Sequence, residues 1–234
     1  ILPPACLSAL PEDDISPRNS EIVLMADLPP ADPESLGIRL PTHMHIWHTA
    51  MDLIEARIDG FRGDQLEVLL RRAEQKTGTT LEEAEIRQSM LLGLRQAAQV
   101  AFCSFIAKGL RQTPVRLRIV GTGWTHPAAD DPEPMTYHRR LALVGETAAV
   151  LHIDLVGQRT GDALLAAGNG ALLIALATPF DDAAGGLATL LKPCEEYVPF
   201  RTLRGLLQSL EQLGTDPAYG SRMTARARAR CRRD

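Results

Sequence analysis

The longest helical pattern of apolar residues in the chain covers about residues 80–110. Apolar positions recur there three or four residues apart, as on one face of an α-helix, and the stretch contains no proline. The segment Thr80-Leu81-Glu82-Glu83 has the spacing of a capping box, which satisfies the first free backbone N–H groups of a helix. Polar residues follow one side at first and then give way to Phe102 and Ile106. We therefore predict a central helix whose last turns are covered by other elements.

Two shorter helical patterns come before this helix. The first covers residues 42–59 and is followed by Gly60, a residue typical of helix ends. The second begins at Asp64, a good capping residue, and stops at Gly78. Together with the central helix they predict a layer of three helices.

After residue 112 the pattern becomes alternating, which is typical of half-buried strands. Residues 115–119 predict one strand, and residues 137–144 and 148–156 predict two more. A three-residue loop between the last two brings their apolar side chains onto one face, so we predict an antiparallel hairpin over 137–156. The expected fold class is therefore α+β: a helical layer around the central helix, packed on a small antiparallel sheet.

The two ends of the chain differ in composition from the middle. Residues 1–41 contain eight of the 16 prolines and predict an extended arm, with one short apolar piece that suits a strand. We expect a globular domain over residues 42–216 and a basic, flexible tail over 217–234. Within the globular domain, residues 171–177 fit a strand or a buried helix equally well, whereas residues 201–213 form a clear amphipathic helical pattern.

The predicted hairpin gives the first candidate for chemistry. Its register places His138 opposite Asp154 and Arg140 opposite His152, on the face away from the leucines. A carboxylate facing an imidazole orients a general base, and an adjacent arginine holds an anion, as in a hydrolase. The alternative is the solvated face of a hairpin with weak cross-strand charge pairs.

A second candidate lies in the first predicted helix. His45, His48 and Asp52 fall on one helical face at a spacing that suits a transition metal. The alternative is a helix that carries histidines without a ligand. The cysteines, Cys6, Cys103, Cys194 and Cys231, have no short spacing and indicate neither a zinc site nor a dithiol. We expect no cofactor.

Overall composition restricts the class of protein. Of the 234 residues, 45% are hydrophobic and 23% are charged, which is typical of a globular protein. The net charge of -4 and the pI near 5.9 argue against nucleic-acid binding by the body of the protein. The tail is different, because its arginines suit contact with nucleic acid or an acidic partner as well as a simple solubilising end. These arginines are Arg222, Arg226, Arg228, Arg230, Arg232 and Arg233.

Without a catalytic motif, the arm and the tail favour a structural or assembly component that acts through other protein subunits in an oligomer. The chain begins with Ile1, which agrees with processing from a longer product, such as a viral or phage structural protein. A metal-dependent or His/Asp hydrolase is the alternative, and a nucleic-acid-associated module is the second alternative. The longest apolar run is too short for a bilayer, so we expect no membrane span and a location in the cytoplasm, the nucleus or a particle assembled there.

Overall fold

The structure is a computed structural model that describes residues 19–125, 127–155 and 160–233. Its strands form one sheet in the order β2-β1-β3-β4-β5, and every pair of neighbouring strands in the described residues is parallel. The strands are β1 (Asn19–Met25), β2 (Leu117–Val120), β3 (Thr147–His152), β4 (Leu172–Leu176) and β5 (Val198–Phe200).

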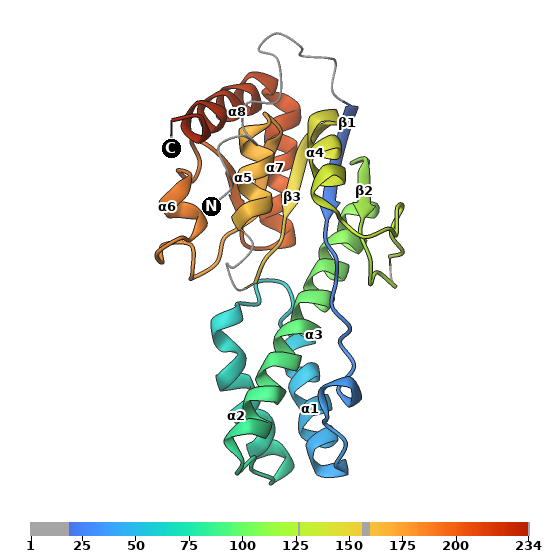
Figure 1. Cartoon of the computed structure of the whole chain (residues 1–234). Helices are drawn as coiled ribbons and strands as arrows, with labels where there is room; N and C mark the ends of the chain where they lie inside the picture. The colour runs from blue at the N-terminus through green and yellow to red at the C-terminus, as the bar shows by residue number, and fades with distance from the viewer. Residues whose placement is uncertain (1–18, 126, 156–159, 234) are drawn as a thin grey trace.

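Helices connect these strands and also build a separate helical part. Figure 1 shows α1, α2 and the first half of α3 in the lower part of the molecule and the sheet in the upper part. The helices are α1 (Pro41–Glu55), α2 (Leu66–Thr77), α3 (Ala84–Arg111), α4 (Tyr137–Glu146), α5 (Thr160–Gly168), α6 (Leu187–Leu190), α7 (Leu203–Thr215) and α8 (Pro217–Cys231). Two 3-10 turns, Glu34–Leu36 and Gly63–Gln65, complete the described elements.

Both faces of the sheet are buried. Side chains alternate along β1, so that Leu24 packs in the cluster that contains α3 and α7, whereas Val23 packs with α4. In the same way Leu173 of β4 packs with α5 on the second face. A parallel sheet covered by helices on both faces is an α/β, Rossmann-like fold.

The predicted antiparallel sheet, its 137–156 hairpin and the α+β class are therefore wrong. Residues 137–146 form helix α4, which starts at Thr136, whose hydroxyl oxygen accepts a hydrogen bond from the Arg139 N–H at 3.4 Å. The alternation of Leu141 and Leu143 suggested a strand, but the adjacent residues Leu143 and Val144 are both buried, as on one face of a helix. A helix between β2 and β3 makes the connection a crossover, and a crossover returns the chain parallel to the preceding strand.

The central helix exists as α3, and Phe102 and Ile106 near its end are fully buried, as predicted. The capping box at its start is not formed. Glu83 is the N-cap residue without a side-chain cap, and the Leu81 N–H donates a hydrogen bond to Glu74 Oε1 of α2 at 2.8 Å. The carboxylate of α2 thus ties the α2–α3 connection to the helical part.

By length and composition, α3 is also apolar enough to cross a membrane. Half of the apolar window is buried inside the structure, and a core helix of a soluble protein has the same property. The absence of a membrane span therefore stays a prediction.

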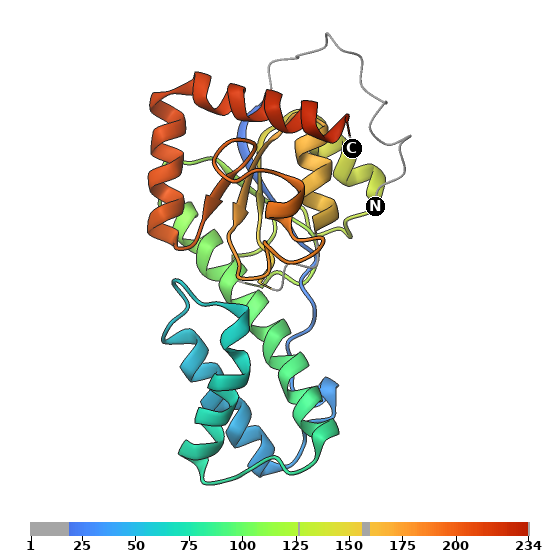
Figure 2. The same ribbon diagram turned by 90° about the vertical axis from the view of Figure 1, so that its left-hand side faces the viewer.

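Both ends of the described chain belong to regular elements. Strand β1, which lies in the predicted arm, is a middle strand of the sheet. The segment expected to be a flexible tail forms α8, because Met223 and Ala227 pack into the core. Figure 2 shows α7 beside the sheet and α8 across the end of the molecule farthest from α1 and α2. Residues 1–18 lie outside the described residues, and the predicted three-part division of the chain stays a prediction.

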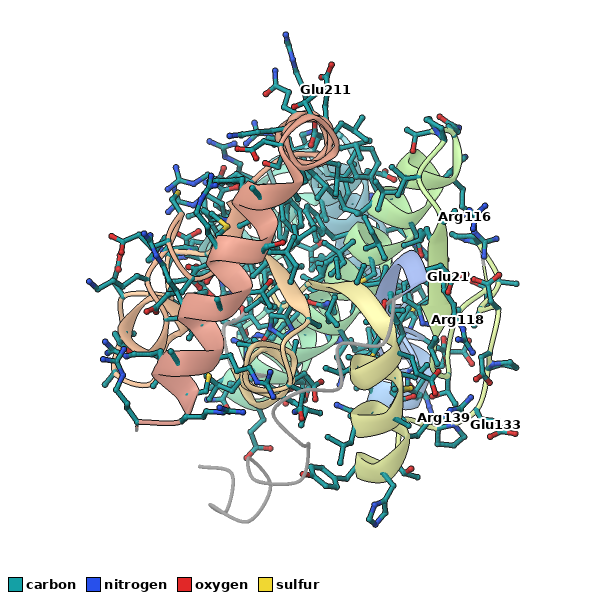
Figure 3. The ribbon with its side chains drawn as sticks, turned by 90° about the horizontal axis from the view of Figure 1, so that it is seen from above. Glu21, Arg116, Arg118, Glu133, Arg139 and Glu211 are labelled. Atoms are coloured by element: carbon teal, nitrogen blue, oxygen red, sulfur yellow. The ribbon has the colours of Figure 1, made fainter. Side chains whose placement is uncertain are left out.

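Strand β2 forms one edge of the sheet. Figure 3 shows Arg116 and Arg118 beside this strand, with Arg139 and Glu133 close to them. Arg139 forms ion pairs with Asp131 and with Glu133. Charged side chains along an edge strand discourage its pairing with another chain, and this edge is rich in them.

A candidate functional site at the carboxyl edge of the sheet

The carboxyl ends of the parallel strands face the helical part of the molecule. In Figure 1 strand β1 runs downward from the top, and the other strands share its direction because the sheet is parallel. Ligands of open α/β sheets bind outside the carboxyl ends of the strands, where the loops meet. This edge is therefore the first place to look for a site.

A loop of the helical part, residues 59–63, closes over this edge. Asp59 Oδ1 accepts a hydrogen bond from the Leu203 N–H at the start of α7, at 2.7 Å. Gly63 lies so close to the end of β3 that a Cβ atom there would stand 2.3 Å from the Leu155 carbonyl oxygen. Only glycine permits this approach, so the loop is fixed against two different parts of the edge.

Gln99 of α3 fixes the end of β3 from the other side. Its Nε2 donates a hydrogen bond to the Ile153 carbonyl oxygen at 2.8 Å, and its Oε1 accepts one from the Leu155 N–H at 3.0 Å. Both backbone groups belong to buried residues beyond the last paired residue of β3. One side chain thus replaces the hydrogen bonds that a further strand residue would supply.

We expect Gln99→Leu to lower the free energy of unfolding by about 2 kcal/mol, because a side chain of similar size leaves two buried backbone groups without partners. Urea denaturation followed by circular dichroism measures the change. Gln96→Leu, one turn earlier on α3, is the matched control, because the Gln96 side chain forms no hydrogen bond in the described structure. A loss of stability that is the same for both substitutions would contradict the role given to Gln99.

Two adjoining cavities open at the carboxyl ends of β4 and β5. The larger has a volume of about 470 Å³ and extends along the start of α7, and the smaller, of about 180 Å³, is closed by Gly60, Phe61 and Arg62 of the helical part. Both are lined by a shared set of residues, which we call the edge site. These residues are Ala177, Thr178, Asp182 and Arg201.

Two neighbouring carboxylates at the edge site differ in their availability. Asp181 is buried, and its two oxygens accept hydrogen bonds from the Thr178 N–H at 2.9 Å and from the Thr178 hydroxyl at 2.6 Å. Asp182 is exposed and forms neither a hydrogen bond nor an ion pair with any residue that the structure describes. Asp181 therefore shapes the loop after β4, whereas Asp182 is free to meet a ligand.

The cationic side of the edge site is Arg201, directly after β5. It is exposed and pairs with no acidic group in the described part of the chain. Arg62, on the wall of the smaller cavity, is by contrast paired with Asp64 at 2.7 Å. An unpaired guanidinium beside a cavity suits an anionic ligand, and phosphate in particular.

A third opening, of about 420 Å³, lies at the end of β1 and is lined by Asp27, Arg140, Gly161 and Asp162. Burial would raise the pKa of Asp27, but hydrogen bonds from the Thr122 and Met135 N–H groups and the charge of Arg140 outweigh it, and the pKa lies below its ordinary value. Arg140 is bound by Asp162, Asp27 and the Met135 carbonyl. Because its cation is already neutralised by two carboxylates, this opening suits an anion less well than the edge site.

The residues predicted for a His/Asp site do not form the expected pairs. His138 and Arg140 lie on α4, and His138 is exposed beside the ring of Tyr137. Asp154 follows the end of β3, and Arg140 binds Asp27 and Asp162. Without a hairpin, the pairing of His138 with Asp154 and of Arg140 with His152 has no structural basis.

The other predicted residues keep their local arrangement. His45, His48 and Asp52 are exposed on α1, and among the described residues no group of three His, Cys, Asp or Glu side chains could hold a metal ion. Four of the tail arginines lie on α8, where Arg222 pairs with Asp216 at 3.3 Å, and Arg232 and Arg233 follow its end. Their contact with nucleic acid or an acidic partner stays a prediction.

Sequence reasoning missed Asp182 and Arg201. One signal was present: each follows an apolar strand closely, and polar residues after a buried strand are typical of a parallel-sheet edge. That signal can be used only after the strands are known to be parallel.

A family model described as glycosyl transferase-like matches residues 95–234, which is more than half of the chain. The chain belongs to this glycosyl transferase-like family. The matched region contains β2 to β5 and the residues shared by the two cavities, whereas β1 and the wall at residues 60–62 lie before it. A comparison with curated proteins found no match.

Membership of the glycosyl transferase-like family corrects the function expected from the sequence. It points to a glycosyltransferase-type enzyme. The structural or assembly component, including the viral or phage structural protein, is therefore wrong, and so is the hydrolase alternative. A nucleic-acid-associated module is likewise replaced as the main function. The expectation of a partner subunit, which is a separate question, stays a prediction.

Proposed function

We propose that the chain is a glycosyltransferase-type enzyme that takes its sugar from a nucleoside diphosphate donor at the edge site. The observation that carries the proposal is the family match, because the matched residues include both Asp182 and Arg201. The edge site has the volume, the unpaired cation and the free carboxylate that the reaction needs.

Arg201 supplies the positive charge for the leaving group. Glycosyl transfer breaks the bond between C1 of the sugar and a phosphate oxygen, and negative charge grows on that phosphate as the bond breaks. A guanidinium with free N–H groups stabilises this charge through two parallel hydrogen bonds. In our proposal the diphosphate therefore lies against Arg201, at the mouth shared by the two cavities.

Asp182 is the group that we assign to the acceptor. The acceptor hydroxyl oxygen forms the new bond to C1, the bond from C1 to the phosphate oxygen breaks, and the hydroxyl proton passes to the Asp182 carboxylate. Asp181 is less suited to this role because both of its oxygens are held by Thr178. A general base has to reach the proton that it accepts, and Asp182 is the exposed carboxylate on the cavity wall.

We expect Arg201→Ala to weaken binding of a nucleoside diphosphate by about 10- to 100-fold, since a hydrogen-bonded charge pair contributes about 1.5–3 kcal/mol and each 1.4 kcal/mol is a factor of ten. Isothermal titration calorimetry with UDP, GDP and ADP measures the effect. The loss should be smaller at high salt, where the exposed charge is screened.

Arg204→Ala is the matched control for this substitution. Arg204 is also exposed and is the second residue of α7, but it lines neither cavity. Equal loss of binding in the two variants would mean that only the general charge of this surface matters, which contradicts the proposed role of Arg201. Unchanged binding in Arg201→Ala would place the diphosphate elsewhere.

A further inference from the structure

Tyr197 combines nearly complete burial with a place on the wall of the larger cavity. Only 1% of the residue is exposed, yet it lines this cavity together with Asp181, Asp182 and Arg201. Its ring packs in the hydrophobic cluster between the sheet and α5. The ring is therefore part of the core, and the question is what the hydroxyl does.

The hydroxyl of Tyr197 has no hydrogen-bond partner among the residues that the structure describes. The Tyr197 oxygen is nevertheless not fully covered by other protein atoms, and Tyr197 is one of the residues that line the larger cavity. A buried phenol normally finds a partner, so this hydroxyl is suited to bonding a group that enters the cavity.

The surroundings determine which kind of group this is. Burial raises the pKa of Tyr197, and the nearby acidic groups, Asp181 first among them, raise it further, so the phenol keeps its proton at any physiological pH. A neutral phenol hydroxyl both donates and accepts hydrogen bonds, and the carboxylates beside it accept them. Sugar hydroxyls, which also both donate and accept, match this mixture of a phenol and carboxylates.

We propose that the Tyr197 hydroxyl binds a hydroxyl group of the donor sugar and so fixes the sugar against Asp182. This inference rests on the proposed function, in which Arg201 holds the diphosphate. Arg201 and Tyr197 then contact different halves of the donor from the same cavity. Tyr197 thus contributes to the choice of sugar, whereas Arg201 responds to any diphosphate.

The substitution Tyr197→Phe tests the inference, because it removes the hydroxyl and keeps the ring in the core. The full chain is titrated with matched pairs of probes: UDP and UDP-glucose, GDP and GDP-mannose, ADP and ADP-glucose. For the pair of probes that wild type binds, we expect Tyr197→Phe to lower the affinity for the sugar nucleotide by about tenfold and to leave the affinity for the free diphosphate unchanged. The melting temperature should not fall, since the hydroxyl has no partner in the described structure. Tyr219→Phe, on α8, is the control for loss of a phenol elsewhere.

Each outcome has a separate meaning. A selective loss of the sugar nucleotide, absent from Tyr219→Phe, supports the inference. Equal affinity of wild type and Tyr197→Phe for the sugar nucleotide overturns it. A lower melting temperature together with an equal loss of affinity for both probes also overturns it, because the hydroxyl would then have a structural role. Binding of free diphosphates by wild type keeps the proposed function intact in those cases. Failure of wild type to bind any probe of the three pairs overturns the proposed function and the inference together.

Discussion

Replacing Asp182 with asparagine is expected to slow glycosyl transfer by about 100- to 10,000-fold, the usual contribution of a general base. Asparagine has nearly the same shape but does not accept a proton from the acceptor hydroxyl. Because Asp182 has no hydrogen bond or ion pair within the described chain, its replacement should leave the fold and the affinity for the donor nearly unchanged. The effect should therefore fall on kcat and not on KM for the donor.

The measurement is the rate of product formation with a saturating donor, using the donor that calorimetry identifies. Two controls separate the base from its neighbours. Glu195→Gln removes an exposed carboxylate outside both cavities and should keep full activity. Asp181→Asn disturbs the bonds to Thr178 and should lower stability as well as activity. Full turnover by Asp182→Asn would exclude this residue as the base.

Replacing Glu74 with alanine is expected to lower the free energy of unfolding by about 3 kcal/mol, at the lower end for a broken buried ion pair. Glu74 is 7% exposed and holds both ends of the α2–α3 connection. Its carboxylate accepts hydrogen bonds from Arg87 at 2.9 and 3.0 Å and from the Leu81 N–H at 2.8 Å. Alanine would leave the buried N–H without a partner and Arg87 with only the more exposed Glu67.

Urea denaturation followed by tryptophan fluorescence is suited to this test, because Trp47 lies in the buried core of the helical part. Glu67→Ala is the matched control, since it pairs with the same Arg87 but is 39% exposed. A surface pair of this kind contributes less than about 1 kcal/mol. If the two substitutions cost the same, the special position of Glu74 would be refuted.

The same carboxylate gives a pH dependence whose direction follows from its pKa. Burial would raise the pKa of Glu74, but the hydrogen bonds from Arg87 and Leu81 bring it below the ordinary value of 4.5. Because the pKa is lowered in the folded state, the carboxylate contributes its full share to the free energy of unfolding above about pH 4.5. This stabilisation is lost as the pH falls through the folded-state pKa. The stability difference between wild type and Glu74→Ala should therefore shrink below pH 4.5. A difference that stays constant down to pH 3 would contradict this.

Local sequence determined several elements of this protein. Helix α2 with its end at Gly78, the central helix α3 and the amphipathic α7 are close to their predicted ranges. Their signals are hydrophobic periodicity and a glycine that accepts a left-handed conformation, and both act within a few residues. Even the failed capping box shows the limit of such signals, because this segment is held instead by Glu74, seven residues before Leu81.

Tertiary structure decided the direction of the strands and the position of the site. Leu141, Leu143 and Val144 fit a strand or a helix, and tertiary packing, which buries Leu143 and Val144, selects the helix α4. A parallel sheet then gathers the residues that follow its strands at one edge, which brings Asp182 and Arg201 together with a loop from the helical part. None of these segments carries a motif of its own, because the chemistry arises from contacts between residues far apart in the chain. Periodicity along the sequence carries no information about such contacts.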